Sequence, residues 1–252
     1  MTTSPFSLFL LLCAAFGAGV MNAIAGGGSL LTFPALVFTG VPAVVANASS
    51  TVALFPGALA SAWGYRKDFT SFQGVSFKAI LGVSFVGGAV GAVLLLSTPE
   101  RTFDVIVPWL LLVATLVFIF GPAITQGAHD LLRVRPLPFL IIHFFLGIYT
   151  GYFGGALGLI TLAVWSLFGL RDMKAMNPNK ILLGGLTNTA AVACFVLAGK
   201  VWWMQSLVML VGAVAGGYFG ARFGRNLDPR IVRVVVITIS IVATIVFFVR
   251  KT

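Results

Sequence analysis

The stretch "NAIAGGGSLLTFP", residues Asn22 to Pro34, decides how this chain folds. It lies in a long apolar region, yet it contains three consecutive glycines, each of which weakens a helix by roughly 1 kcal/mol relative to alanine. Backbone groups left unpaired by such a break are tolerated deep in a membrane only where protein covers them or where they line a polar cavity. We therefore expect a broken helix here, with a functional site beside it.

The composition is that of a membrane protein. Hydrophobic residues make up 59% of the 252 residues and charged residues only 9%, whereas a soluble domain has about 25% charged residues. Several charge-free stretches are long enough to cross the roughly 30 Å hydrocarbon core of a bilayer. The predicted fold class is therefore an all-α polytopic membrane protein. Because no Lys or Arg precedes the first apolar run, we expect no cleaved secretory signal.

The formal net charge of +10 is better explained by membrane orientation than by nucleic-acid binding, because cytoplasmic loops of membrane proteins are rich in Lys and Arg. An assignment of four basic loops to the cytoplasm gives that side 12 of the 16 basic residues and puts both termini outside. The predicted cytoplasmic loops are 66–78, 122–136, 170–180 and 222–233.

The chain also contains a weak internal repeat with an offset of about 130 residues. "LLVATLVFIF" (111–120) matches "SIVATIVFFV" (240–249), and "VGGAVGA" (86–92) matches "AGGYFGA" (215–221). Each copy contains five helical pieces, and an odd number of pieces reverses the direction of the second copy. We therefore predict two inverted repeats, each a broken-helix hairpin plus three transmembrane helices. The predicted boundaries are 1–125 and 137–252, joined by a cytoplasmic loop at 126–136.

Inverted repeats with discontinuous helices are typical of secondary transporters, whose binding sites lie where the repeats meet near the middle of the membrane. The second piece of each copy is too short to span the bilayer. We therefore expect each hairpin tip to stop partway through. The predicted helices are 5–25, 29–40, 46–65, 75–97 and 103–121 in the first copy, and 137–154, 157–169, 178–198, 203–222 and 231–249 in the second.

Two longer motifs carry a family resemblance. "GAGVMNAIAGGGSLLTFPAL" and "ANASSTVALFPGALASAWGY", both repeated in weaker form after residue 147, resemble the TauE/SafE family of sulfite and organosulfonate exporters. The resemblance covers nearly the whole chain. It implies transport of small sulfur-containing or carboxylate anions, most often outward across a bacterial inner membrane. In the second copy Val164 stands where the first has Pro34, so we expect the second hairpin to be more regular.

An anion site within lipid needs positive potential, which the N-terminus of a helix supplies through its free N–H groups and its dipole. "ANASST" places Asn47 as a predicted N-cap, and "MNPNK" places Asn177 as an N-cap with Pro178 at the first helical position. Because the two helices are repeat partners, we expect their first turns to face each other across the site. The candidate substrate-binding residues in these turns are Asn47, Ser49, Ser50, Thr51, Asn177, Asn179 and Lys180.

Each candidate has a structural alternative. Asn47 and Asn177 can cap helices without touching a substrate, and Lys180 can flank the membrane on its cytoplasmic side instead of neutralising the anion. At the two breaks, glycines can offer backbone N–H groups to the anion or simply allow close helix packing. The candidates there are Gly27, Gly28, Ser29, Gly155 and Gly158.

Other polar and small residues are assigned to packing. The glycine stripes at 87–91 and 216–224 are predicted to be helix–helix contacts, which leaves a homodimer open as a second use. Asn22 is expected to hydrogen-bond between helices. His143 is expected to be a hydrogen-bonded packing residue, or else the proton carrier if transport is proton-coupled.

No catalytic residue, metal or cofactor is predicted. The sequence contains no GxSxG, no HExxH and no Cys/His cluster, so an embedded enzyme is disfavoured. Cys13 and Cys194 indicate neither a disulfide nor a metal site. The predicted function is a secondary carrier of small sulfur anions in the lipid bilayer, and the alternatives are an anion channel or a carrier of small carboxylates.

Overall fold

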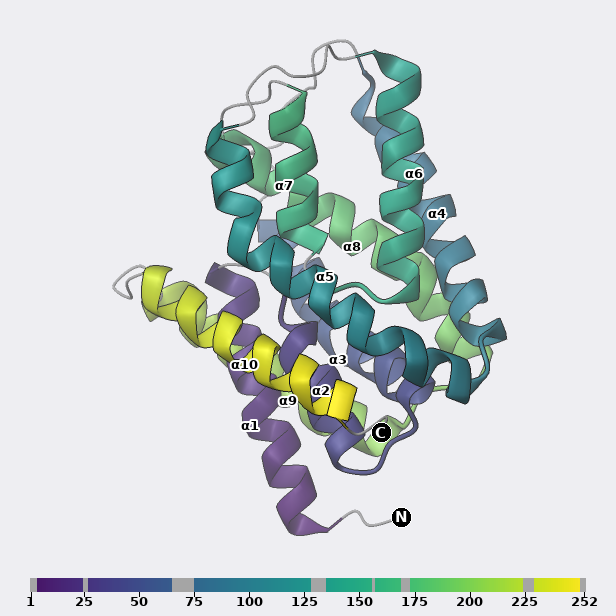
Figure 1. Cartoon of the computed structure of the whole chain (residues 1–252), viewed down its shortest axis with the longest axis vertical. Helices are drawn as coiled ribbons and strands as arrows, with labels where there is room; N and C mark the ends of the chain where they lie inside the picture. Colours follow the sequence, from purple (N-terminus) through teal and green to yellow (C-terminus); the bar gives the residue numbers. More distant parts are fainter. Residues whose placement is uncertain are drawn as a thin grey trace.

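The structure, a computed structural model of the chain, describes residues 4–24, 27–64, 75–127, 135–155, 157–168, 173–223 and 229–249. These residues fold into ten helices (Figure 1). The helices are α1 (Pro5–Ile24), α2 (Ser29–Phe38), α3 (Ala43–Gly64), α4 (Phe77–Ser97), α5 (Glu100–Gly127), α6 (Pro136–Tyr152), α7 (Leu157–Leu167), α8 (Met173–Leu197), α9 (Trp203–Phe223) and α10 (Pro229–Val249).

The surface has the character of a protein embedded in lipid. Large apolar side chains such as Phe6, Trp109 and Val249 are more than half exposed, which is unfavourable in water and favourable in hydrocarbon. Four helices in the described part are long and apolar enough to cross a membrane. These findings confirm the predicted all-α polytopic membrane fold. The four spans are Pro5–Ala23, Phe77–Ser97, Pro178–Leu197 and Trp203–Gly220.

Both predicted helix breaks are present. Gly27, between α1 and α2, has a φ of +89°, and Gly154, between α6 and α7, has a φ of +75°. Both values lie in the left-handed region that favours glycine. The arms that follow, α2 and α7, have only 10 and 11 residues, too few to span a bilayer. The expectation of a more regular second hairpin is wrong, because Gly154 supplies the turn without a proline in the next arm.

Two pairs of helices, α1 with α9 and α4 with α6, pack through glycine. A Cβ added to Gly216 would overlap the carbonyl oxygen of Phe16, and one added to Gly91 would overlap that of Ile148. The predicted packing role of both stripes is confirmed within the described residues, outside which Gly224 falls. Because the stripes are used inside the chain, they give no support to the expected homodimer.

The directions of these pairs follow from the same contacts. Gly212 of α9 lies against Leu12 of α1 and Gly220 lies against Val20, so the two helices run parallel. The helices α4 and α6 are parallel in the same way. The first helices of the two halves are α1 and α6, and the fourth are α4 and α9. In both pairs, the first helix of one half packs parallel to the fourth helix of the other half.

In contrast, α3 and α8 run antiparallel. Ser49, near the start of α3, accepts a hydrogen bond from the N–H of Trp202, which follows the end of α8. Farther along α3, Leu59 lies beside Gly185, in the middle of α8. The first turns of these two helices therefore lie toward opposite ends of their shared interface.

The predicted N-caps of α3 and α8 are wrong, and α5 begins at Glu100, three residues before its predicted start. The Ala46 N–H donates to the Pro42 carbonyl at 2.7 Å, and Glu100 Oε2 accepts from the Val44 N–H at 3.0 Å. Because α3 begins at Ala43 and a carboxylate from α5 binds its N-terminus, Asn47 lies inside the helix and does not cap it.

The second wrong N-cap is the one predicted for α8. This helix begins at Met173 and continues through Pro178, so Asn177 is not an N-cap and Pro178 is not the first helical residue. A proline inside a membrane helix is tolerated because neighbouring groups satisfy the backbone that it leaves unpaired. Similarly, α5 runs to Gly127, beyond its predicted end at 121 and into the predicted connecting loop.

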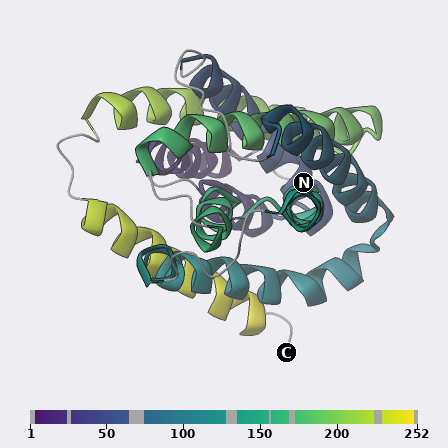
Figure 2. The same ribbon diagram turned by 90° about the horizontal axis from the view of Figure 1, so that it is seen from above.

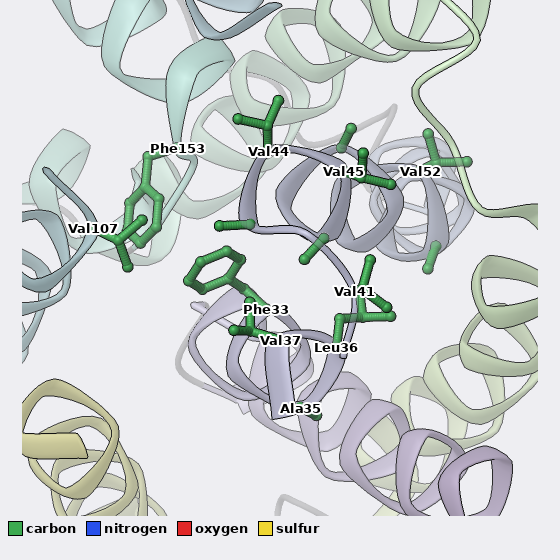
Figure 3. Close-up of a cluster of buried hydrophobic side chains, with 14 of the residues drawn as sticks. Phe33, Ala35, Leu36, Val37, Val41, Val44, Val45, Val52, Val107 and Phe153 are labelled. Atoms are coloured by element: carbon green, nitrogen blue, oxygen red, sulfur yellow. The ribbon is translucent and has the colours of Figure 1, made fainter. Parts of the chain in front are cut away.

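Phe33 lies at the centre of the apolar core (Figure 3). Its ring centroid is 5.7 Å from that of Phe153, 6.3 Å from Phe103 and 5.6 Å from Phe247. The core therefore joins the short arm α2 to α5, to α10 and to the second break. Helices α5 and α10 lie side by side in both views (Figures 1 and 2), so the first hairpin is enclosed by both halves of the chain.

Candidate functional site

The two halves meet at the helix breaks. The Asn47 Nδ2 donates to the carbonyl of Tyr152, at the end of α6, across 2.9 Å. A Cβ built on Gly155 would lie 3.5 Å from Leu30 Cδ2, in the first turn of α2. The two halves thus connect through the breaks, and the expected face-to-face arrangement of the first turns of α3 and α8 is replaced by these contacts.

In the first half, the hydroxyl groups are already hydrogen-bonded. Thr32 Oγ1 of α2 lies 2.6 Å from Ser50 Oγ of α3, and both residues are fully buried. Thr51 Oγ1 donates to the Asn47 carbonyl at 2.9 Å. Ser49 Oγ accepts the Trp202 N–H at 2.9 Å. Ser49 and the Thr32–Ser50 pair therefore connect α3 to neighbouring segments, whereas Thr51 bonds within α3.

The first break is supported by a side chain from the preceding helix. The Gly28 N–H donates to Asn22 Oδ1 at 2.7 Å, so Asn22 bonds within the hairpin and not between separate spans. A Cβ on Gly28 would lie 2.6 Å from the Ala18 carbonyl oxygen, which makes glycine a packing requirement here. Gly27 and Ser29 beside it are half-buried.

In the second half, Lys180 lies against the second hairpin. A Cβ built on Gly158 would lie 3.4 Å from Cδ of Lys180 and 3.7 Å from its Nζ. The Lys180 side chain is half-buried, and within the described part of the chain it makes neither a hydrogen bond nor an ion pair. A partly desolvated ammonium without a carboxylate partner is suited to attract an anion.

The remaining candidates of the second half are Asn177, Asn179 and Gly155. Asn179 is fully buried, and the side chain of Asn177 falls outside the part that the structure describes. Gly155 is buried, and its carbonyl accepts the hydroxyl of Tyr149 at 2.7 Å. The second break is therefore held by Tyr149 as the first is held by Asn22.

Sequence reasoning missed one pair of residues in the short arms. Thr161 lies in α7, one turn after Gly158, with 1% of its surface exposed, and its Oγ1 has no hydrogen-bond partner in the part of the chain that the structure describes. With Gly40 matched to Gly169, an offset of 129 residues, Thr161 falls opposite Thr32, and Ala163 rather than Val164 falls opposite Pro34. A residue-by-residue alignment of the two arms would have revealed this shared polar position.

His143 is a packing residue, as predicted. Its Nε2 accepts the indole N–H of Trp165 at 2.8 Å, and its Nδ1 lies 2.7 Å from the carbonyl oxygen of Phe139. Because an indole N–H can only donate, Nε2 carries no proton and Nδ1 is the donor to Phe139. Both ring nitrogens are therefore used inside the α6–α7 contact.

The groups described near the breaks are of kinds that can bind an anion. They comprise one ammonium group, threonine and serine hydroxyls, and backbone amides beside two broken helices. Within the described ranges, no group of three or more His, Cys, Asp or Glu side chains could hold a metal ion.

The description "Sulfite exporter TauE/SafE" belongs to the family whose sequence model matches residues 11–247. The chain belongs to the TauE/SafE family. A "Probable membrane transporter protein" of Haemophilus influenzae is 34% identical to this TauE/SafE chain, over 94% of it and 92% of the relative. "Probable membrane transporter protein YfcA" of Escherichia coli K12 is 33% identical, over 95% of this chain and 88% of the relative. No solved structure matches the chain. This TauE/SafE member is a membrane transporter and not an enzyme.

Proposed function

We propose that this TauE/SafE protein is a secondary carrier that exports small sulfur-containing anions, such as sulfite or organosulfonates, across a bacterial inner membrane. The observation that carries the proposal is the position of Lys180, which lies half-buried against Gly158 at the second hairpin and lacks a partner in the described residues. Ionisable residues within membrane spans commonly mark the pathway of a charged substrate.

The proposal includes two inverted repeats, with both termini outside. Two features of the packing support the inverted repeats, and the basic residues of the predicted cytoplasmic loops support the orientation. Helices α1 and α9 pair in parallel as α6 and α4 do, which is the exchange expected of a pseudo-two-fold axis. The corresponding helices α3 and α8 run antiparallel, and corresponding elements of inverted repeats have opposite directions in the membrane.

The helix breaks supply the rest of the mechanism. An anion that leaves water loses its hydration shell, so the protein must replace those hydrogen bonds with donors of its own. Hydroxyl and amide groups beside Lys180 provide such donors, and the ammonium provides the compensating charge. Movement of one hairpin against the other half would then expose this site to each side of the membrane in turn.

Transport in proteoliposomes tests the proposal. We would measure uptake of sulfite, sulfoacetate, taurine, thiosulfate and small carboxylates, with and without a pH gradient, and repeat each measurement after preloading the vesicles with unlabelled anion. A carrier of sulfur anions predicts uptake of sulfite or a sulfonate that is accelerated by preloading. Uptake of carboxylates alone would refute the substrate class, uptake without acceleration would indicate an anion channel, and no uptake of any solute would refute the proposal.

A further inference from the structure

The two short arms carry a threonine at an equivalent position, but the residue that corresponds to its partner differs between the two halves. In the first half, Thr32 of α2 shares a 2.6 Å hydrogen bond with Ser50 of α3. The repeat places Thr161 of α7 at the position of Thr32, and Lys180 of α8 at the position of Ser50. A neutral pair of hydroxyls in the first half thus corresponds to a hydroxyl and an ammonium group in the second.

The first-half pair has no hydroxyl proton left to donate to an anion without breaking one of its own hydrogen bonds. Thr32 Oγ1 contacts Ser50 Oγ and also lies 3.3 Å from the carbonyl oxygen of Gly28, to which it donates. Both side chains are fully buried. This pair therefore closes the contact between α2 and α3.

In the second half, the hydroxyl of Thr161 and the ammonium of Lys180 have unused hydrogen-bonding capacity within the described residues. Thr161 Oγ1 is buried and has no hydrogen-bond partner among the described residues, a condition that costs about 1–3 kcal/mol if nothing compensates it. Thr161 follows Gly158 by three residues, so the two residues lie on the same side of α7. Gly158 is the residue against which Lys180 packs. Gly158 and Thr161 therefore share one side of α7, and Lys180, whose ammonium makes no hydrogen bond or ion pair within the described residues, lies against that side at Gly158.

We propose that Thr161 is a specificity-determining residue, whose hydroxyl donates a hydrogen bond to one oxygen of the transported anion while Lys180 Nζ binds another. This inference rests on the proposed function and narrows it. Recognition by two donors requires a substrate with at least two acceptor oxygens on one centre, as in sulfite, a sulfonate or a carboxylate. Binding of the anion satisfies the orphaned hydroxyl and the ammonium together, and the equivalent position of the first half cannot act in this way because Thr32 is already bonded to Ser50.

Sulfite uptake by proteoliposomes containing Thr161→Val, Thr161→Ser or Thr32→Val tests this assignment. Loss of a hydrogen bond to a charged group corresponds to roughly a 10- to 100-fold change in affinity. We expect Thr161→Val to raise the half-saturating sulfite concentration by that factor, with an unchanged maximal rate and an unchanged or higher melting temperature. Thr161→Ser should restore the half-saturating concentration to within about twofold of the parent.

Thr32→Val is the matched control, because it removes the equivalent hydroxyl from a satisfied pair. This substitution should lower the melting temperature and leave the half-saturating sulfite concentration within about twofold of the parent's. Two results would overturn the assignment alone: a Thr161→Val protein with the parent's half-saturating concentration, or one that loses melting temperature and maximal rate as Thr32→Val does. If the parent itself moves no sulfite while it moves another of the anions tested, the proposed substrate is wrong. If it moves none, the proposed function fails as well.

Discussion

Lys180 of α8 and Gly158 of α7 are in direct contact, with only 3.4 Å between the lysine Cδ and the position that a Cβ on Gly158 would take. This spacing is ordinary van der Waals contact for one methyl group and too short for a branched side chain. We predict that Gly158→Ala transports nearly normally, whereas Gly158→Leu displaces the Lys180 side chain and reduces sulfite uptake at least tenfold. Normal uptake by a folded Gly158→Leu protein would show that this contact is not part of the site.

Asn47 connects the two halves through the Tyr152 carbonyl. Asn47→Ala leaves that carbonyl without its donor in a buried position, so we expect a loss of about 1–3 kcal/mol of stability, measured as thermal unfolding in detergent. Thr51→Val is the control, because the Thr51 hydroxyl bonds only to the backbone of its own helix, and it should change stability by less than about 0.5 kcal/mol. Equal stability of the two variants would contradict the role given to Asn47.

The glycine contacts between helices make a separate prediction. Gly216→Ala and Gly91→Ala each place a methyl group on a backbone carbonyl of the partner helix, and we expect each to cost about 1–3 kcal/mol or more. Gly82→Ala, on α4 but with open space around it, should be neutral or stabilising by up to about 1 kcal/mol because alanine favours the helix. Tolerance of all three substitutions alike in a thermal unfolding series would refute the close packing.

Inverted insertion is tested by labelling single cysteines from one side of the membrane, in a background with Cys13→Ser and Cys194→Ser. Ser76 precedes α4 and Lys200 precedes α9, the fourth helices of the two halves, and both residues are exposed. We predict that Ser76→Cys reacts only from the cytoplasm and Lys200→Cys only from outside. Reaction of both from the same side would exclude inverted repeats.

Features encoded by neighbouring residues could be predicted from the sequence. The glycine cluster before Ser29 and the pair Gly154–Gly155 marked both breaks, because a left-handed turn needs glycine where it occurs. The stripes at Gly91 and Gly216 marked helix contacts, since small residues at this spacing form one flat face. His143 was correctly assigned to packing, as expected of a single histidine on an apolar helix.

Features that depend on distant residues could not be predicted in this way. The start of α3 was misplaced because its N-terminal N–H groups are bound by Glu100, 56 residues farther along the chain, so no local cap was needed. The start of α8 was misplaced because Pro178, typical of a first helical position, lies inside a longer helix. The antiparallel arrangement of α3 and α8 also depends on contacts between the halves, so their first turns were wrongly expected to face each other.

The most direct test of the account is whether sulfite stabilises the purified protein through Lys180. Ligand at 100 times its dissociation constant stabilises a folded protein by about 2.7 kcal/mol, which is measurable as a rise in melting temperature. We predict this rise in the parent and in Lys200→Met, which removes an exposed lysine at the other end of α8, and its loss in Lys180→Met. An equal rise in Lys180→Met, or no rise in the parent, would contradict an anion site at the second hairpin.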